Sequence, residues 1–174
     1  VVISGATSAQ LVLTGVQLSQ AGSYTVVVSN FVGSVTSGAA ILTVNDSPTI
    51  LAQPADVVAV KDENVTFAVS AGGAAPLAYQ WYKDGVAISG AVSSALSLTR
   101  VQAAQAGSYY VMVSNVAGWA TSKVVQLTVN VPPAISTQPA SLTAIQGTNV
   151  IFNVAATGTA PVLRLPVGVA VQPP

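Results

Sequence analysis

The chain has 174 residues, with five Lys and Arg against five Asp and Glu, so its formal net charge is +0. Charged residues make up only 6% of the sequence, which excludes the basic surface that nucleic acid binding requires. Hydrophobic residues make up 51%, but polar residues interrupt them every few positions, and no run approaches the roughly 18 residues that span a bilayer. We therefore expect no nucleic acid partner and no membrane insertion.

The sequence contains no Cys and no His. This excludes disulfides and thiolate chemistry, and it removes the commonest general base and metal ligand. The acidic residues do not suggest a site either. Asp62 and Glu63 are adjacent in an expected turn, where their side chains diverge, and Asp46 and Asp62 lack the dense ligand spacing of a calcium loop. We expect no enzyme activity, no cofactor and no metal.

One segment of the chain occurs twice. Residues 11–45 read LVLTGVQLSQAGSYTVVVSNFVGSVTSGAAILTVN, and residues 96–130 read LSLTRVQAAQAGSYYVMVSNVAGWATSKVVQLTVN, an offset of 85 without a gap. About three in five positions are identical, and residues 47–67 return at the same offset as residues 132–152. A period of this length indicates a small independent domain that is used repeatedly, because solenoid repeats are shorter.

Short alternating stretches predict strands, each bounded by Gly, Pro, Asn or Ser. In chain order these strands are expected at residues 65–69, 79–83, 96–98, 109–113 and 125–129. Asp84-Gly85 predicts a hairpin turn after the second strand, and residues 115–118 predict another turn. Strands at this spacing, with a turn signal between each pair, are typical of an antiparallel β-sandwich. We therefore expect an all-β fold.

These residues resemble the immunoglobulin-like fold of the intermediate-set kind. Trp81, in the second expected strand, is similar to the core tryptophan of the family's strand C. Residues 105–111 (QAGSYYV) are similar to the D-x-G-x-Y-x-C motif around the tyrosine corner, with Gln for Asp and Val for Cys. The first copy repeats the motif with Gln20, Gly22, Tyr24 and Val26.

The resemblance implies specific structural roles. Val69 and Val111 stand where the family has its inter-sheet disulfide, so two facing valines are expected to fill that space by packing. Tyr109 is expected to place its hydroxyl on a backbone group a few residues upstream, and Gly107 is expected in the tight turn before it. These roles serve the fold and not a reaction.

The resemblance also predicts the domain organisation. Residues 46–131 match one complete immunoglobulin-like domain. Residues 1–45 match the second half of a unit, from about strand C′ to strand G, and residues 132–161 match the first half, strands A and B. The two ends of the complete domain should lie at opposite poles. We therefore interpret the two halves as pieces of neighbouring repeats.

Residues 162–174 depart from the repeat and are interpreted as an aberrant tail. Arg164-Leu165-Pro166 stand where the repeat predicts Tyr-Gln-Trp, and they overlap the stretch Leu165-Pro166-Val167-Gly168. Codons CTA-CCA-GTG-GGN for these four residues read Tyr-Gln-Trp after a shift of one nucleotide. The hypothesis is a frameshift, which the coding DNA would test.

Trp119 is the one candidate contact residue. It lies in the expected F–G hairpin at the position where the first copy has Ser34, so the fold does not require it. An aromatic ring there suits stacking on a sugar ring or contact with a protein partner. The simpler interpretation, packing against a neighbouring domain or plain exposure, is favoured.

The sequence therefore predicts a non-catalytic structural or adhesion spacer. We interpret the chain as a fragment of a tandem immunoglobulin-like array in a large, bacterial, secreted or cell-surface protein. Its expected partners are neighbouring repeats, with a cell-surface protein or a glycan as further candidates. The alternative function is a carbohydrate- or protein-binding module that uses exposed loop aromatics such as Trp119.

Overall fold

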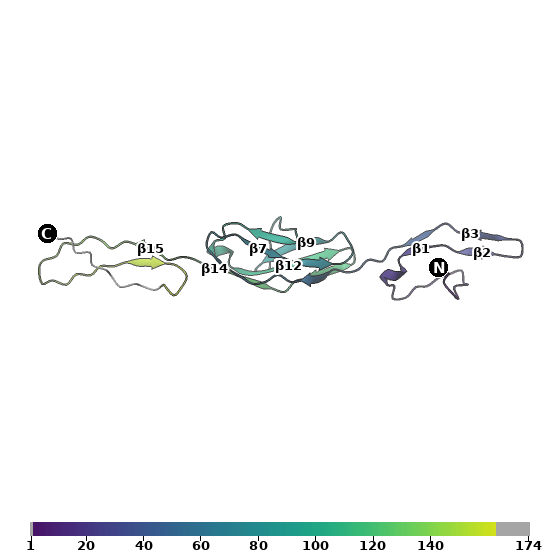
Figure 1. Cartoon of the computed structure of the whole chain (residues 1–174), viewed down its shortest axis with the longest axis horizontal. Helices are drawn as coiled ribbons and strands as arrows, with labels where there is room; N and C mark the ends of the chain where they lie inside the picture. The colour runs from purple at the N-terminus through teal and green to yellow at the C-terminus, as the bar shows by residue number, and fades with distance from the viewer. Residues whose placement is uncertain (1, 163–174) are drawn as a thin grey trace.

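The computed structural model describes residues 2–162 of the chain. These residues form three parts in a row, and the middle part, drawn in teal and green, is a two-layered β-sandwich (Figure 1). The first and last parts extend from opposite ends of it, so the two ends of the middle part lie at opposite poles, as expected. Apart from Val162, the tail to which the frameshift hypothesis applies lies outside the described residues, so that hypothesis stays a prediction.

The larger layer of the middle part is a sheet in the order β10-β9-β12-β14-β6, with β13 also paired to β12. Neighbouring strands are antiparallel, except that β14 and β6 are parallel. Its strands are β6 (Val57–Val60), β9 (Ala78–Lys83), β10 (Val86–Ala87), β12 (Gly107–Asn115), β13 (Gly118–Thr121) and β14 (Val125–Asn130). The predicted turns after Lys83 and after Asn115 join β9 to β10 and β12 to β13.

The smaller layer pairs β11 with β7 and β5 with β8, all antiparallel. Its strands are β5 (Thr49–Ala52), β7 (Val65–Ala68), β8 (Ser70–Gly72) and β11 (Ala95–Leu98). The strand expected over 65–69 ends at Ala68 as β7. The chain then continues as β8, because it pairs with β11 before this point and with β5 after it. The amide of Val69 donates to the carbonyl of Ser94 at this point, with an N···O distance of 3.0 Å.

The core lies between the two layers and confirms the expected roles of its largest side chains. Trp81 is fully buried, and the ring of Phe67 stacks on that of Tyr109 with centroids 5.1 Å apart. Val69 and Val111 are both buried in this core, so apolar packing fills the positions of the family's disulfide. The remaining core residues are Ala59, Val65, Leu96, Val101, Val113, Val125, Leu127 and Val129.

The expected tyrosine corner is present at the start of β12. The hydroxyl of Tyr109 donates to the carbonyl of Gln105, at 2.7 Å, in the short 3-10 helix η2 (Ala103–Gln105). Gly107 has a φ of +146°, and a Cβ there would stand only 2.6 Å from a carboxylate oxygen of Asp84. That oxygen accepts the amide of Ser108 at 2.9 Å. Glycine is therefore required both by the backbone and by the approach of the carboxylate.

The last strand of the sandwich is divided into β13 and β14 by a bulge that the sequence did not predict. Ser122 lies in the bulge, and its amide donates to the carbonyl of Val111 at 2.9 Å. The buried hydroxyl of Ser122 accepts the amide of Val111 at 3.0 Å and donates to the carbonyl of Lys123 at 2.9 Å. These bonds satisfy the backbone groups that an extra residue leaves unpaired in the ladder.

The first part repeats the same local geometry. Its elements are η1 (Leu18–Gln20), β1 (Gly22–Tyr24), β2 (Val27–Ser29), β3 (Ser34–Thr36) and β4 (Ala40–Leu42). β1 pairs with β4, and β2 pairs with β3. The hydroxyl of Tyr24 donates to the carbonyl of Gln20 at 2.6 Å, so a second tyrosine corner is formed.

The last part contains β15 (Ala134–Thr137) and β16 (Ala155–Thr157), which pair antiparallel. Their ladder has an irregularity between Ile135 and Thr137. The β5–β8 ladder has the same irregularity between Ile50 and Ala52, exactly one repeat period earlier. Sequence recurrence is thus accompanied by recurrence of strand pairing.

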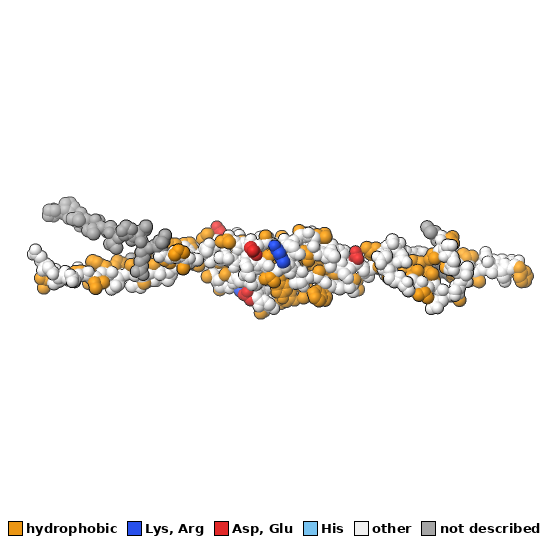
Figure 2. Space-filling view, turned by 90° about the horizontal axis from the view of Figure 1, so that it is seen from below, with side chains coloured by type: hydrophobic (Ala, Val, Ile, Leu, Met, Phe, Trp, Pro, Cys, Tyr) orange, Lys and Arg blue, Asp and Glu red, His pale blue; other side chains and the backbone are white. Residues whose placement is uncertain are grey.

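Charge and burial distinguish the middle part from the other two. Within residues 2–162, every Lys, Arg, Asp and Glu lies between Asp46 and Lys123, and the charged side chains visible in Figure 2 lie on the middle part. The first and last parts expose many apolar side chains, among them Phe31 at 101% and Phe152 at 63%. Their local pairing is therefore formed without a core of comparable depth.

Candidate functional site

Trp119 lies in the middle of β13 and is 67% exposed. It pairs across the ladder with Ser114 of β12. The other tryptophan differs in both respects, because Trp81 is fully buried and its indole N–H donates to the carbonyl of Ser93 at 2.9 Å. The structure therefore favours plain exposure of Trp119 over packing, and its indole is accessible to a partner.

Strand register places Trp119 on the outer surface of the larger sheet. Side chains alternate between the two surfaces, and directly paired residues share one. The ladder pairs Tyr110 with Tyr82, and their rings stack with centroids 4.8 Å apart and planes 3° from parallel. We call this surface the aromatic face. It comprises Ala78, Gln80, Tyr82, Tyr110, Met112, Ser114, Trp119 and Thr121.

The aromatic face carries no Lys, Arg, Asp or Glu side chain. The nearest charges along β9 are Lys83 and Asp84, which form an ion pair with each other. The Lys83 ammonium, followed by the amide of Ser108, holds the pKa of the Asp84 carboxyl below its usual range. Burial, followed by the charge of Asp84, raises the pKa of Tyr109. Both shifts arise at the tyrosine corner, where the groups have structural roles.

The acidic residues do not converge on a reaction centre. As expected, Asp62 and Glu63 diverge: the Glu63 carboxylate accepts the amide of Val60 at 2.8 Å, whereas Asp62 accepts from the side chain of Gln102 at 2.7 Å. Within the described part of the chain, no group of three Asp, Glu, His or Cys residues is placed to hold a metal ion. No helix among residues 2–162 has the length and apolar character needed to cross a membrane.

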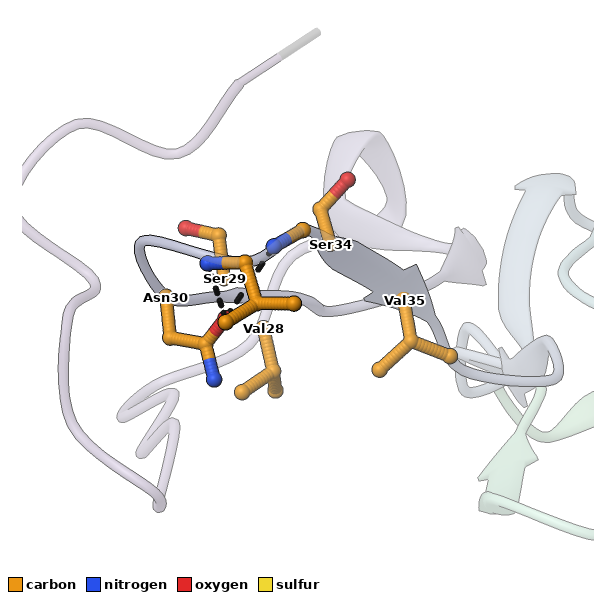
Figure 3. A pocket seen from close by; sticks show the side chains of 7 residues that line it. Val28, Ser29, Asn30, Ser34 and Val35 are labelled. Carbon is orange, nitrogen blue, oxygen red and sulfur yellow. Dashed lines mark hydrogen bonds between the residues drawn. The ribbon is translucent and has the colours of Figure 1, made fainter.

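A shallow pocket lies at the β2–β3 hairpin of the first part (Figure 3). It is lined by the two strands of the hairpin and by Asn30 at the turn. The side-chain oxygen of Asn30 accepts the amides of Val32 at 2.9 Å and Gly33 at 3.1 Å. This oxygen is therefore engaged in holding the turn, and the pocket is a feature of one hairpin.

Asn115 is a structurally important residue that the sequence did not identify. Its side-chain amide donates to the carbonyls of Asp46, at 2.7 Å, and Ala74, at 2.9 Å. Its side-chain oxygen accepts the amides of Ala117 and Gly118, at 2.8 and 3.1 Å. One side chain thus ties the chain entering the sandwich to two of its loops. The sequence signal for this role was the recurrence of the residue, because Asn30 stands at the same position in the first copy.

Comparison with known proteins gives the class to which this architecture belongs. Residues 47–115 match the family model described as "Immunoglobulin domain". Roundabout homolog 3 of Homo sapiens is 32% identical over 157 residues, covering 87% of this chain and 11% of that protein. Hemicentin-1 of Homo sapiens is 32% identical over 166 residues, covering 89% of this chain and 3% of that protein. Neuroglian of Drosophila melanogaster is 27% identical, covering 86% and 12% respectively.

Solved structures agree with this assignment. An I-band fragment of titin superposes with a TM-score of 0.73 at 25% identity, covering 84% of this chain and 54% of the fragment. Extracellular domains 3–5 of Drosophila OTK superpose with a TM-score of 0.52 at 24% identity, covering 66% and 41%, and show likeness of fold alone. The expected all-β, immunoglobulin-like fold is confirmed.

The chain therefore contains an immunoglobulin-like domain that is homologous to immunoglobulin domains of Roundabout homolog 3, hemicentin-1, neuroglian and titin. The chain spans only 11%, 3% and 12% of the lengths of the three curated relatives. These relatives are eukaryotic, so the bacterial source expected from composition is not supported. Low charge and an abundance of small residues describe a domain surface and do not identify a source.

Proposed function

We propose that this chain serves as a non-catalytic structural or adhesive spacer in a secreted or cell-surface protein built of tandem immunoglobulin-like repeats. Residues 46–131 are the complete repeat in this proposal, and residues 1–45 and 132–161 belong to its neighbours, which are its immediate partners. The relatives support this role because they are adhesion or structural proteins with immunoglobulin domains. The observation that carries the proposal is the junction after β14.

The sandwich holds the first residue of this junction. Asn130 is the last residue of β14 and stands opposite Val60 in the parallel ladder with β6. Its carbonyl also accepts the amide of Lys61 at 2.8 Å. The chain therefore leaves the middle part as a hydrogen-bonded strand.

The last part holds the next residue. The amide of Val131 donates to the hydroxyl of Thr159 at 2.6 Å, and its carbonyl accepts the amide of Thr159 at 2.9 Å. Pro132 and Pro133 follow, and their rings fix φ. A Cβ on Gly158 would stand 3.0 Å from the Cα of Pro133. The loop that contains Gly158 and Thr159 therefore lies directly against the linker Pro132-Pro133.

At the junction before the middle part, the sandwich holds its own first residue through the equivalent contacts. The carbonyl of Asp46 accepts the amide of Ala74 at 3.1 Å and the side-chain amide of Asn115. A Cβ on Gly73 would stand 3.0 Å from the Cα of Pro48. The junction after β14 is held from both sides, which leaves little freedom between the middle and last parts and suits a stiff spacer more than a flexible tether.

Relaxation of backbone ¹⁵N nuclei tests the stiffness. We expect amides of β14 and β15 to report one common, anisotropic rotational diffusion. Replacing Pro132 and Pro133 by Gly together with Thr159→Val should give the two strands separate diffusion. Thr143→Val, in an exposed loop of the last part, is the matched control and should leave the common diffusion intact.

Independent diffusion of β14 and β15 in the unaltered chain would contradict the spacer proposal. A hydrolase activity that copurifies with the chain and persists through further chromatography would contradict its non-catalytic part. Localisation is tested separately, by protease accessibility of the native protein on intact cells and in the culture medium. Protection from protease together with absence from the medium would contradict the proposed location.

A further inference from the structure

The two ends of the aromatic face carry aromatic rings. Trp119 stands beside Ser114, and Tyr110 lies four residues earlier on β12. At the rise of an extended strand this separation is about 13 Å. Tyr82 and Tyr110 are half-buried and stack on each other, so each ring covers one face of the other and the pair offers its ring edges and remaining faces. The exposed ring of Trp119 is apolar and flat, which suits contact with the C–H face of a sugar ring.

Uncharged polar groups lie between the rings. Thr121 brings a hydroxyl between the rings and Ser114 brings one beside Trp119, and hydroxyls donate and accept hydrogen bonds. The side-chain nitrogen of Gln80 donates to the carbonyls of Trp81, at 2.9 Å, and Ile88, at 2.8 Å. These two bonds fix the orientation of the Gln80 amide and leave its oxygen as a positioned acceptor. Sugar hydroxyls are matching donors.

Charge and shape narrow the ligand class. Because the aromatic face has no Lys, Arg, Asp or Glu and the neighbouring Lys83 and Asp84 neutralise each other, an uncharged ligand is the electrostatic match. The face is the surface of a sheet, and two shallow pockets of the described chain lie elsewhere, lined by residues within 28–35 and 142–151. A small ligand generally requires a concave site, whereas an extended polymer can lie along a flat sheet.

We propose that the aromatic face binds a linear, uncharged polysaccharide. One sugar unit stacks on Trp119, another contacts the edge of the Tyr82–Tyr110 pair at the other end, and Gln80 accepts from the sugar hydroxyls between them. The proposal is independent of the spacer role: failure to bind leaves the junction argument intact, and a flexible junction leaves the face intact.

Affinity electrophoresis in native gels tests the proposal. Separate gels contain laminarin, xylan or hydroxyethylcellulose as neutral polymers, and alginate as an acidic polymer. We expect retardation in at least one neutral gel and normal migration in alginate. Trp119→Ala should weaken that binding by about tenfold, and Trp119→Phe should restore part of it. Tyr110→Ala should also weaken it.

Phe31→Ala is the matched control, because Phe31 is an exposed aromatic residue outside the aromatic face. It should keep full retardation, and the thermal midpoint of Trp119→Ala should stay close to that of the unaltered chain. Normal migration in all three neutral gels would overturn the proposal. Retardation confined to alginate, retention of full binding by Trp119→Ala, or equal loss in Phe31→Ala would overturn it as well.

Discussion

Residues 22–30 and residues 107–115 have closely similar sequences, GSYTVVVSN and GSYYVMVSN, but they lie in different surroundings. Tyr24 and Tyr109 make the same hydroxyl-to-carbonyl bond, at 2.6 and 2.7 Å. Their neighbours differ greatly in burial, because Val26 is 53% exposed whereas Val111 is fully buried. One segment therefore forms the same tyrosine corner with a core and without one.

The comparison separates what a segment specifies locally from what the whole sandwich supplies. The tyrosine corner spans five residues, so its hydrogen bond forms in both settings. Burial of Tyr109 and Val111 requires side chains from other strands, notably Phe67 of β7 and Trp81 of β9. Hydrogen bonds fix the shape of the segment, and burial from other strands provides most of its stability.

The largest expected effect concerns the two tryptophans. Trp81→Ala should lower the free energy of unfolding of the middle part by about 3–5 kcal/mol, because it removes the largest fully buried side chain. Trp119→Ala should cost less than about 1 kcal/mol, since its side chain is mostly exposed. Urea unfolding followed by circular dichroism measures both. Equal losses would show that the two strands are wrongly assigned.

A smaller difference is expected between equivalent valines. Val111→Ala should destabilise the middle part by about 2 kcal/mol, through lost burial and a residual cavity. Val26→Ala, at the same repeat position, should change the unfolding free energy by no more than a few tenths of a kcal/mol. Thermal unfolding of the two variants checks this. A large effect of Val26→Ala would mean that the first part has a core of its own.

Removal of the two tyrosine hydroxyls should give a smaller difference in unfolding free energy than truncation of the two valines. Tyr109→Phe removes one hydrogen bond to Gln105 and should cost about 1 kcal/mol. Tyr24→Phe removes the equivalent bond but should leave the main unfolding transition unchanged, because that transition reports the middle part. Fluorescence of Trp81 in urea gives the measurement. A matching shift in both variants would show that the two parts unfold together.

The smallest expected effect is a dependence on acid that only the middle part shows. The pKa of Asp84 is lowered in the folded chain by Lys83 and Ser108, so its contribution is complete above the unfolded pKa of about 4 and is lost as the pH falls through the folded value. Asp84→Asn should flatten this acid limb. At the equivalent corner, nothing lies within 4 Å of where a Cβ of Gly22 would stand. An unchanged acid limb in Asp84→Asn would rule this contribution out.

Sequence patterns predicted those features whose cause lies within a few residues or in an alternating strand. Trp81, the tyrosine corner and the valine pair belong to this group: the resemblance to the immunoglobulin-like fold identified them, and the tyrosine corner also recurs in the first copy. The bulge at Ser122 and the Asn115 side chain were missed, since their bonds depend on which strand or loop the assembled sandwich places beside them. Both residues recur in the first copy, as Ser37 and Asn30. The repeat therefore marked them as structural, although a polar residue in a turn is by itself common.

The candidate site was predicted only in part. Trp119 stood out because the first copy has Ser34 in its place. Its association with Tyr82 and Tyr110 depends on which residues pair across β9, β12 and β13. Register is set by the assembled sheet, so a linear pattern identifies a single aromatic residue but not the face to which it belongs.

Native-state hydrogen exchange tests the comparison most directly, because both copies are present in one molecule. The amide of Val111 donates to the buried hydroxyl of Ser122, and the amide of Val26 donates to the exposed hydroxyl of Ser37, at 3.0 and 3.1 Å. If burial by other strands supplies the stability, the Val111 amide should exchange only through global unfolding of the middle part, and the Val26 amide orders of magnitude faster. Equal protection of the two amides would contradict this account.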